Sequence, residues 1–200
     1  MNVLEAIEAR RAVKAFDPTH DMPEEDFKKL MHAGCLAPTA FNIQHTRFLV
    51  VKDRELRKQI RAVSWDQSQV TDASILIIVC ADAKAWEKDP SRYWRYAPQP
   101  VRDFMVPTIL NYYGNREMAQ RDESMRSCGL AAQNLMLAAK GLGYDSCPLD
   151  GFDFDEVAQM INLPDDHLIS MFVTIGKGIK EASPRSGPIE EDEQILFDRF

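Results

Sequence analysis

Residues 127–142 read Ser127-Cys128-Gly129-Leu130-Ala131-Ala132-Gln133-Asn134-Leu135-Met136-Leu137-Ala138-Ala139-Lys140-Gly141-Leu142. Wound as an α-helix, this stretch is apolar on nearly all sides, and a helix of that kind must be buried. Gly141 and Gly143 indicate where it ends. We therefore predict a long interior helix that the rest of the chain surrounds.

Apolar runs on both sides of this helix predict β-strands. Ala73–Ala81 is β-branched around Ile77 and far shorter than the ~18 residues of a membrane span, which indicates a buried strand. Phe48–Val51 and Ile169–Ile175 have the same character, and Tyr144–Gly151 predicts a short extended piece that ends in a turn. Further helices are expected from Asn2 to Arg11, from Pro23 to Gly34, and over Asp53–Val63, Val101–Met118 and Phe154–Ile161. This mixture without repeats predicts one α+β domain over residues 1–200.

Composition narrows the possible functions. A net charge of −7 argues against a general nucleic-acid binder, and no apolar run is long enough to span a membrane. The four cysteines and four histidines are scattered without metal-ligand spacing, so no metal site is expected. Because we find no secretory signal and no paired cysteines, we expect a cytoplasmic protein.

Three cations follow the first predicted helix closely. Asn2 and Glu5 suit its N-terminus, which leaves Arg10 and Arg11 in the last turn and Lys14 just beyond. Cations at a helix C-terminus complement the macrodipole, and that alone could explain them. The alternative is a site for an anionic ligand, which needs further groups from elsewhere in the chain.

Four other segments offer such groups, although each could also be ordinary surface. Ala37–Gln44 is a polar loop, and Trp65–Gln69 presents two amides that can bind a heterocycle edge. Gly151 in the turn Cys147–Phe152 allows a backbone to approach a ring closely. Arg185 lies between two prolines on a stiff segment and is suited to bidentate phosphate binding.

Taken in order, these segments resemble the FMN-dependent nitroreductase family over residues 4–188. The family begins with Arg-Arg-Ser-x-Arg/Lys-x-Phe, matched at Arg10–Phe16, and continues with Ala-Pro-Ser-x-x-Asn-x-Gln, matched at Ala37–Gln44. The other matches are a Gln-rich turn before a strand at Gln67–Ser74 and a glycine-ended helix with Ala-Gln-Asn-Leu at Gly129–Gly143. A Pro-x-x-Gly-Phe turn at Pro148–Phe152 and a basic residue in the tail at Arg185 complete the pattern.

The resemblance implies a nitroreductase-like α+β fold, with a mostly antiparallel sheet flanked by helices, in an intertwined homodimer. The tail from about 182 to 200, acidic and then apolar, is expected to pack on the partner. Two FMN sites would lie at the subunit interface. One chain would contribute Arg10, Arg11, Ala12, Lys14, Asp66, Gln69, Pro148, Leu149, Asp150, Gly151 and Arg185, and the other Pro38, Thr39, Ala40 and Asn42.

The implied activity is hydride transfer from NADH or NADPH through FMN to a nitroaromatic, quinone, enone or small aldehyde, with donor and acceptor alternating at one site. No catalytic side chain is expected, because the flavin carries the chemistry and Lys14 tunes it. Aromatic residues between Trp86 and Tyr113 would shape the acceptor pocket or simply pack. Two alternatives stay open: a dehalogenating or flavin-fragmenting branch of the superfamily, and a flavin-binding protein without turnover.

The sequence departs from the family pattern at a few positions. Ala12 stands where the family often has serine, which removes one hydroxyl contact. Asp66 and Gln69 stand where one subgroup has asparagine and lysine. With Lys14 as the main positive charge near the ring, we expect a less oxidising flavin than in that subgroup.

Overall fold

The computed structural model describes residues 1–200, which form a four-stranded antiparallel sheet in the order β1-β2-β4-β3. The strands are β1 (Thr46–Val51), β2 (Ile75–Asp82), β3 (Asp145–Leu149) and β4 (His167–Gly176). One row of the register runs across the whole sheet, from Leu49 through Ile78 and Phe172 to Leu149. The predicted α+β class with an antiparallel sheet is confirmed.

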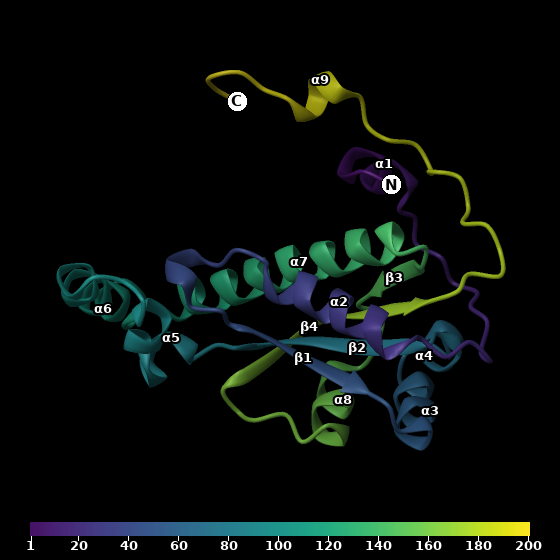
Figure 1. Ribbon diagram of the computed structural model, residues 1–200, viewed down its shortest axis with the longest axis horizontal. Helices are drawn as coiled ribbons and strands as arrows, with labels where there is room; N and C mark the ends of the chain where they lie inside the picture. The colour runs from purple at the N-terminus through teal and green to yellow at the C-terminus, as the bar shows by residue number, and fades with distance from the viewer.

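Helices cover both faces of the sheet (Figure 1), with α2 (Glu24–Cys35) and α7 (Glu117–Gly141) on one face and α3 (Arg54–Ala62) and α8 (Phe154–Met160) on the other. Every residue of β2 is buried, so its alternating side chains enter two separate cores. Ile77 packs in the core that contains Leu135 of α7. Ile78 packs in the other core with Ile60 and Val157.

The interior helix α7 is longer than predicted, because it begins at Glu117 and not at Ser127. Its first half is polar, with one buried side formed by Gln120, Glu123 and Ser124, and internal partners satisfy these polar groups. Gln120 donates through Nε2 to the carbonyl of Tyr113 at 2.8 Å, and Ser124 donates to the carbonyl of Gln120 at 2.7 Å. Because this first half of α7 is polar, the sequence did not indicate that it is helical and packed against the interior.

The helix predicted over Val101–Met118 is wrong at both ends. The observed helix α6 runs from Gln99 to Tyr113, and the chain then turns before α7. Gly114 is extended and Asn115 has a left-handed φ of 57°, which glycine and asparagine adopt more readily than other residues. The remaining short elements are α4 (Gln69–Asp72), α5 (Ala85–Lys88), η1 (Ala40–Asn42) and η2 (Pro90–Trp94).

The first helix, α1 (Val3–Ala9), has the predicted capping box between Asn2 and Glu5. It ends at Ala9, so the prediction that Arg10 and Arg11 lie in its last turn is wrong. Arg10 has an extended backbone because the following residues pair with the sheet. The apolar side chains Leu4 and Ile7 of this helix are exposed in this chain, Leu4 by 72%.

The chain after β4 extends away from the body and passes α1 before it reaches α9 (Glu191–Gln194) (Figure 1). All residues from 183 to 200 are exposed, including the side chains of Ile195, Leu196 and Phe197. None of the helices combines the length and the apolar composition needed to cross a bilayer.

Candidate functional site

The segment that follows α1 is fixed between β3 and the chain after β4. Val13 donates its backbone N–H to the carbonyl of Ser146 at 3.1 Å, and Ile179 donates to the carbonyl of Ala15 at 3.0 Å. Val13 and Phe16 are buried and pack with Ala73. Because Val13 is buried in this way, its neighbours Ala12 and Lys14 are exposed.

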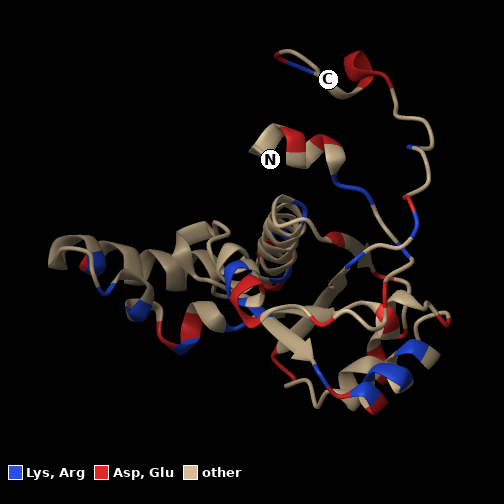
Figure 2. Ribbon diagram, turned by 45° about the vertical axis from the view of Figure 1, so that its right-hand side comes forward, with Lys and Arg blue, Asp and Glu red and all other residues tan.

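A cavity of about 780 Å³ lies against this segment, in the size range of small-molecule sites. Glu181 is the one carboxylate of its lining, which otherwise has polar, small and basic residues. The basic residues are Arg10, Arg11, Lys14, Lys180 and Arg185. Figure 2 shows the cationic segment, in blue, directly after α1.

None of these five cations forms an ion pair. Arg11 instead donates to the carbonyl of Ser183, and Arg185 donates to the carbonyl of Glu8 at 3.2 Å. These two bonds hold the tail against the N-terminal segment. In a chain of net charge −7, such a group of unpaired cations fits an anionic ligand.

Strand β3 forms the floor of this region. Pro148 lines the cavity, and Cys147 beside it is buried. Burial raises the pKa of the Cys147 thiol, while the positive charges of Lys14 and Arg10 act in the opposite direction. The two cations therefore lie close enough to β3 to influence a group within it.

The predicted turn at Trp65–Gln69 contacts the turn after β3. Gln67 donates through Nε2 to the carbonyl of Gly151 at 3.1 Å, and Gln69 donates to Gln67 Oε1 at 3.0 Å. Gln69 is only 3% exposed, whereas Asp66 is exposed and forms an ion pair with Arg61 at 2.7 Å. Asp66 and Gln69, which were both predicted to bind the cofactor, thus already have partners within the protein.

Gly151 lies close against the ring of Trp65. A Cβ atom at this position would lie 2.7 Å from the ring of Trp65, which is itself 81% exposed. Trp65 and Asp66 have φ values of 52° and 50°, a left-handed pair that is costly for residues with side chains. The neighbouring Leu149 is buried and Asp150 is exposed.

The predicted residues Pro38, Thr39, Ala40 and Asn42 do not reach this cavity. Their loop lies at the opposite end of the sheet from the segment after α1 (Figure 1). Ala40 donates its N–H to Glu123 of α7 at 3.3 Å, and Thr39 accepts from the N–H of Gln44 at 3.0 Å. Within one chain, the two predicted halves of the site are therefore separate.

Comparison with known proteins identifies the family of this chain. The model of the family described as "Nitroreductase family" matches residues 7–177. This chain belongs to the nitroreductase family. The match includes the cationic segment, the Trp65–Gln69 turn and the turn after β3, while Arg185 lies beyond it.

Several relatives resemble this nitroreductase over almost its whole length. Protein DrgA of Synechocystis is 51% identical over 182 residues, covering 91% of this chain and 87% of DrgA. MhqN of Bacillus subtilis, named as a candidate NAD(P)H nitroreductase, is 31% identical over 194 residues, covering 92% and 94%. A crystal structure from Exiguobacterium sibiricum, described as a candidate nitroreductase in complex with FMN, superposes with a TM-score of 0.90 at 28% identity, covering 99% of this chain and 98% of that one.

Sequence reasoning missed some residues that line the cavity of this nitroreductase. Lys180, Ser183 and Gly187 all contribute, and only their proximity to Arg185 in the sequence could have indicated them. A different cavity of about 470 Å³, between the chain near His20 and helix α3, contains none of the predicted residues. Its buried Arg57 already donates to the carbonyls of Val70 and Ala73 at 2.8 and 2.6 Å.

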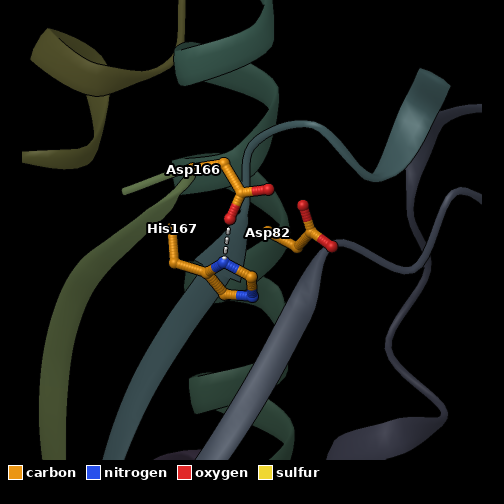
Figure 3. A group of neighbouring side chains, drawn as sticks. All are labelled: Asp82, Asp166 and His167. Carbon is orange, nitrogen blue, oxygen red and sulfur yellow. Dashed lines mark hydrogen bonds and ion pairs between the residues drawn. The ribbon is translucent and has the colours of Figure 1, made fainter. Parts of the chain in front are cut away.

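Asp82, Asp166 and His167 form a second group of polar side chains (Figure 3). Their ligand atoms lie within 4.8 Å of one another, a spacing that could hold a metal. Lys88 already lies between the carboxylates, 2.8 Å from Asp82 and 2.7 Å from Asp166, and His167 Nδ1 is 2.6 Å from Asp166. This cation and these hydrogen bonds account for the cluster as an ion-pair network.

Proposed function

We propose that this chain holds FMN in the cavity of Arg10, Lys14 and Arg185 and passes electrons from NADH or NADPH to a nitroaromatic, quinone, enone or small aldehyde. As a member of the nitroreductase family it is an NAD(P)H-dependent FMN oxidoreductase. The observation that carries the proposed site is the cluster of unpaired cations on one cavity. FMN bound there would supply the hydride-transfer chemistry between the nicotinamide and the acceptor.

The cations would contact different parts of FMN. Arg10 and Arg185 are suited to the phosphate, since guanidinium groups donate two parallel hydrogen bonds to phosphate oxygens. Arg11 is held by the Ser183 carbonyl and adds positive charge from the side. Lys14 would approach the pyrimidine edge of the ring, where its charge favours the electron-rich form.

The turns at Trp65–Gln69 and Pro148–Gly151 would form the rest of the cofactor site. Gln69 can donate to the ring edge if its amide exchanges its bond with Gln67 for the ligand. Asp66 would need to turn from Arg61 in the same way. The backbone at Leu149, Asp150 and Gly151 lies beside Pro148 of the cavity and would face the ring.

A second copy of the chain would complete the site. Because Pro38–Asn42 and Arg10–Lys14 lie at opposite ends of the sheet within one chain (Figure 1), they can contact the same ligand only across a subunit interface. The exposed tail from 182 to 200 supports the same arrangement, since a partner would cover its apolar side chains. We infer a homodimer, and the four unpaired cysteines suit a reducing cytoplasm.

The test uses the colour of the purified protein. We expect yellow protein whose flavin absorbance is bleached by NADH or NADPH and restored by a quinone. Replacing Arg10 and Arg185 with Gln should weaken FMN binding at least about tenfold, whereas Lys58→Gln on the exposed face of α3 should leave it unchanged.

Three results would contradict this proposal. Colourless protein that takes up no FMN would refute the cofactor site. Yellow protein that neither nucleotide bleaches would favour a flavin-binding protein without turnover. Loss of intact FMN during turnover, or release of halide from a halogenated aromatic without reduction of quinones, would favour the flavin-fragmenting or dehalogenating branch.

A further inference from the structure

A second basic cavity, of about 450 Å³, lies at the end of the molecule that carries the Pro38–Asn42 loop. Arg47, Arg92 and Arg95 line it together with Tyr93 and Tyr96, and no carboxylate belongs to the lining. The cavity is separate from the one that holds Arg10 and Arg185. The proposed cofactor site uses none of these arginines.

Two of the three arginines form no ion pair. Arg92 and Arg95 form no ion pair, and each guanidinium lies over the ring of the tyrosine that follows it, at 5.7 and 4.9 Å from the centroid. Arg47 is fixed more firmly, because it donates to backbone carbonyls at Gln44 and Thr46 and contacts Asp82 at 3.4 Å. The cavity therefore contains one fixed and two unpaired guanidinium groups.

The loop that borders the cavity is held in a strained conformation. Asn42 and Gln44 have φ values of 57° and 53°, and Asn42 donates through Nδ2 to the carbonyl of Tyr93 at 2.9 Å. This bond ties the loop to η2, so the amides and the arginines keep a fixed relation. Strain of this kind is found where a binding surface must be kept in place.

We propose that this cavity binds the phosphate-bearing adenosine end of the hydride donor and selects NADPH over NADH. The inference rests on the proposed function, in which the Pro38–Asn42 loop reaches the flavin of the partner. In that arrangement the cavity beside Asn42 lies next to the place where the nicotinamide must stack. The remainder of the dinucleotide then has a basic surface to occupy.

The chemistry of the lining favours this ligand. The 2′-phosphate of NADPH adds charge that NADH lacks, and unpaired guanidinium groups bind phosphate oxygens through charge-assisted hydrogen bonds. Tyr96 is 89% exposed at the same cavity and offers a ring on which adenine can stack. An anionic acceptor could use the same charges, and the experiment distinguishes the two.

The first measurement is calorimetric titration of FMN-saturated protein with adenosine 2′,5′-bisphosphate. We expect it to bind more tightly than adenosine 5′-monophosphate, and the Arg92→Gln/Arg95→Gln variant to lose about tenfold in affinity for the bisphosphate. Arg116→Gln is the matched control, because Arg116 also lies over a tyrosine ring, 5.4 Å from Tyr112, outside this cavity. Equal binding by the wild type and the double variant would overturn the inference.

The second measurement is steady-state reduction of a neutral quinone. In the double variant the KM for NADPH should rise about tenfold, while the KM for NADH and the kcat with either donor stay within twofold. A variant that weakens only the reduction of a sulfonated quinone, with an unchanged ratio of NADPH to NADH efficiency, would assign the cavity to the acceptor and overturn the inference.

The two proposals fail in different ways. If neither nucleotide bleaches the wild-type flavin, the proposed function is wrong, and the calorimetric result still decides whether the cavity recognises the bisphosphate. If both nucleotides bleach it with equal efficiency in the wild type and in the double variant, the oxidoreductase stands and the assignment of this cavity is wrong.

Discussion

Lys14 is a side chain whose charge lies near β3 and which forms no ion pair. If it faces the pyrimidine edge of the flavin, Lys14→Ala should lower the midpoint potential, because it removes the charge that favours the reduced ring. A spectroscopic redox titration measures this shift, with Lys58→Ala on α3 as the control. An unchanged potential in Lys14→Ala would contradict this role.

The candidate site was only partly predictable at the scale of single residues. Arg10, Lys14 and Arg185 stand out as cations, and a cation at a helix end is common enough to need no ligand. Their convergence depends on the bond from Val13 to Ser146 and the bond from Ile179 to Ala15, which join distant parts of the chain. No local pattern carries that information, so the resemblance to a family had to supply it.

Arg57 connects two elements through a buried contact. Its guanidinium, on α3, donates to the carbonyl of Val70 within α4 and to that of Ala73, the residue that follows α4. Arg57→Leu should lower the free energy of unfolding by about 2–4 kcal/mol, since two buried carbonyls lose their donor. Urea denaturation measures the change, and Arg54→Leu on the exposed face of α3 should cost less than about 0.5 kcal/mol.

The ion-pair network around Asp166 links β4 to α5 and should make stability depend on pH. Hydrogen bonds from Lys88 and His167 hold the pKa of Asp166 below its usual value of 3.8. A lowered folded-state pKa stabilises the protein above the unfolded pKa, and this stabilisation is lost as pH falls through the folded pKa. Asp166→Asn should therefore be less stable than the wild type at pH 6.

Unfolding curves measured from pH 6 to pH 2.5 test this dependence. The difference between Asp166→Asn and the wild type should shrink as the pH falls below 3.8. The neighbouring exposed Asp165→Asn should show a smaller difference throughout. A difference of constant size over the whole range would show that the loss is not electrostatic.

Secondary-structure elements were predictable where the chain is apolar and periodic. The strands around Ile77 and Phe172 and the end of α7 near Gly141 follow directly from hydrophobic runs and a terminal glycine. The first half of α7 was missed, because its buried groups, Gln120 and Ser124, are polar and are satisfied by contacts that only the fold provides. The break after Tyr113 was missed, although Gly114 and Asn115 are residue types that favour turns.

The C-terminal residues of the chain form an exposed apolar surface. Ile195, Leu196 and Phe197 are exposed beyond α9, and Phe197 is 83% exposed. If these side chains pack on a partner, replacing all three with serine should raise the dimer dissociation constant at least about tenfold, because their apolar area would no longer be buried. Analytical ultracentrifugation measures the constant directly.

A charge-neutralised tail is the control for this substitution. Glu191→Gln, Asp192→Asn and Glu193→Gln alter the same helix, α9, without removing apolar area, and the dimer should be preserved. Both variants keep Arg185, so the proposed flavin cavity remains complete. A dimer that is equally tight in the wild type and in the triple-serine variant would place the interface elsewhere.

The pairing of Val13 with Ser146 and of Ala15 with Ile179 also has a consequence for biosynthesis. The cationic segment is among the first residues that the ribosome synthesises. Its partners, Ser146 and Ile179, emerge only when most of the chain has been translated. At about 5–20 residues per second this delay is about ten seconds or more. We therefore expect the nascent chain to remain without flavin until synthesis ends, so that cofactor loading is an event of the finished polypeptide.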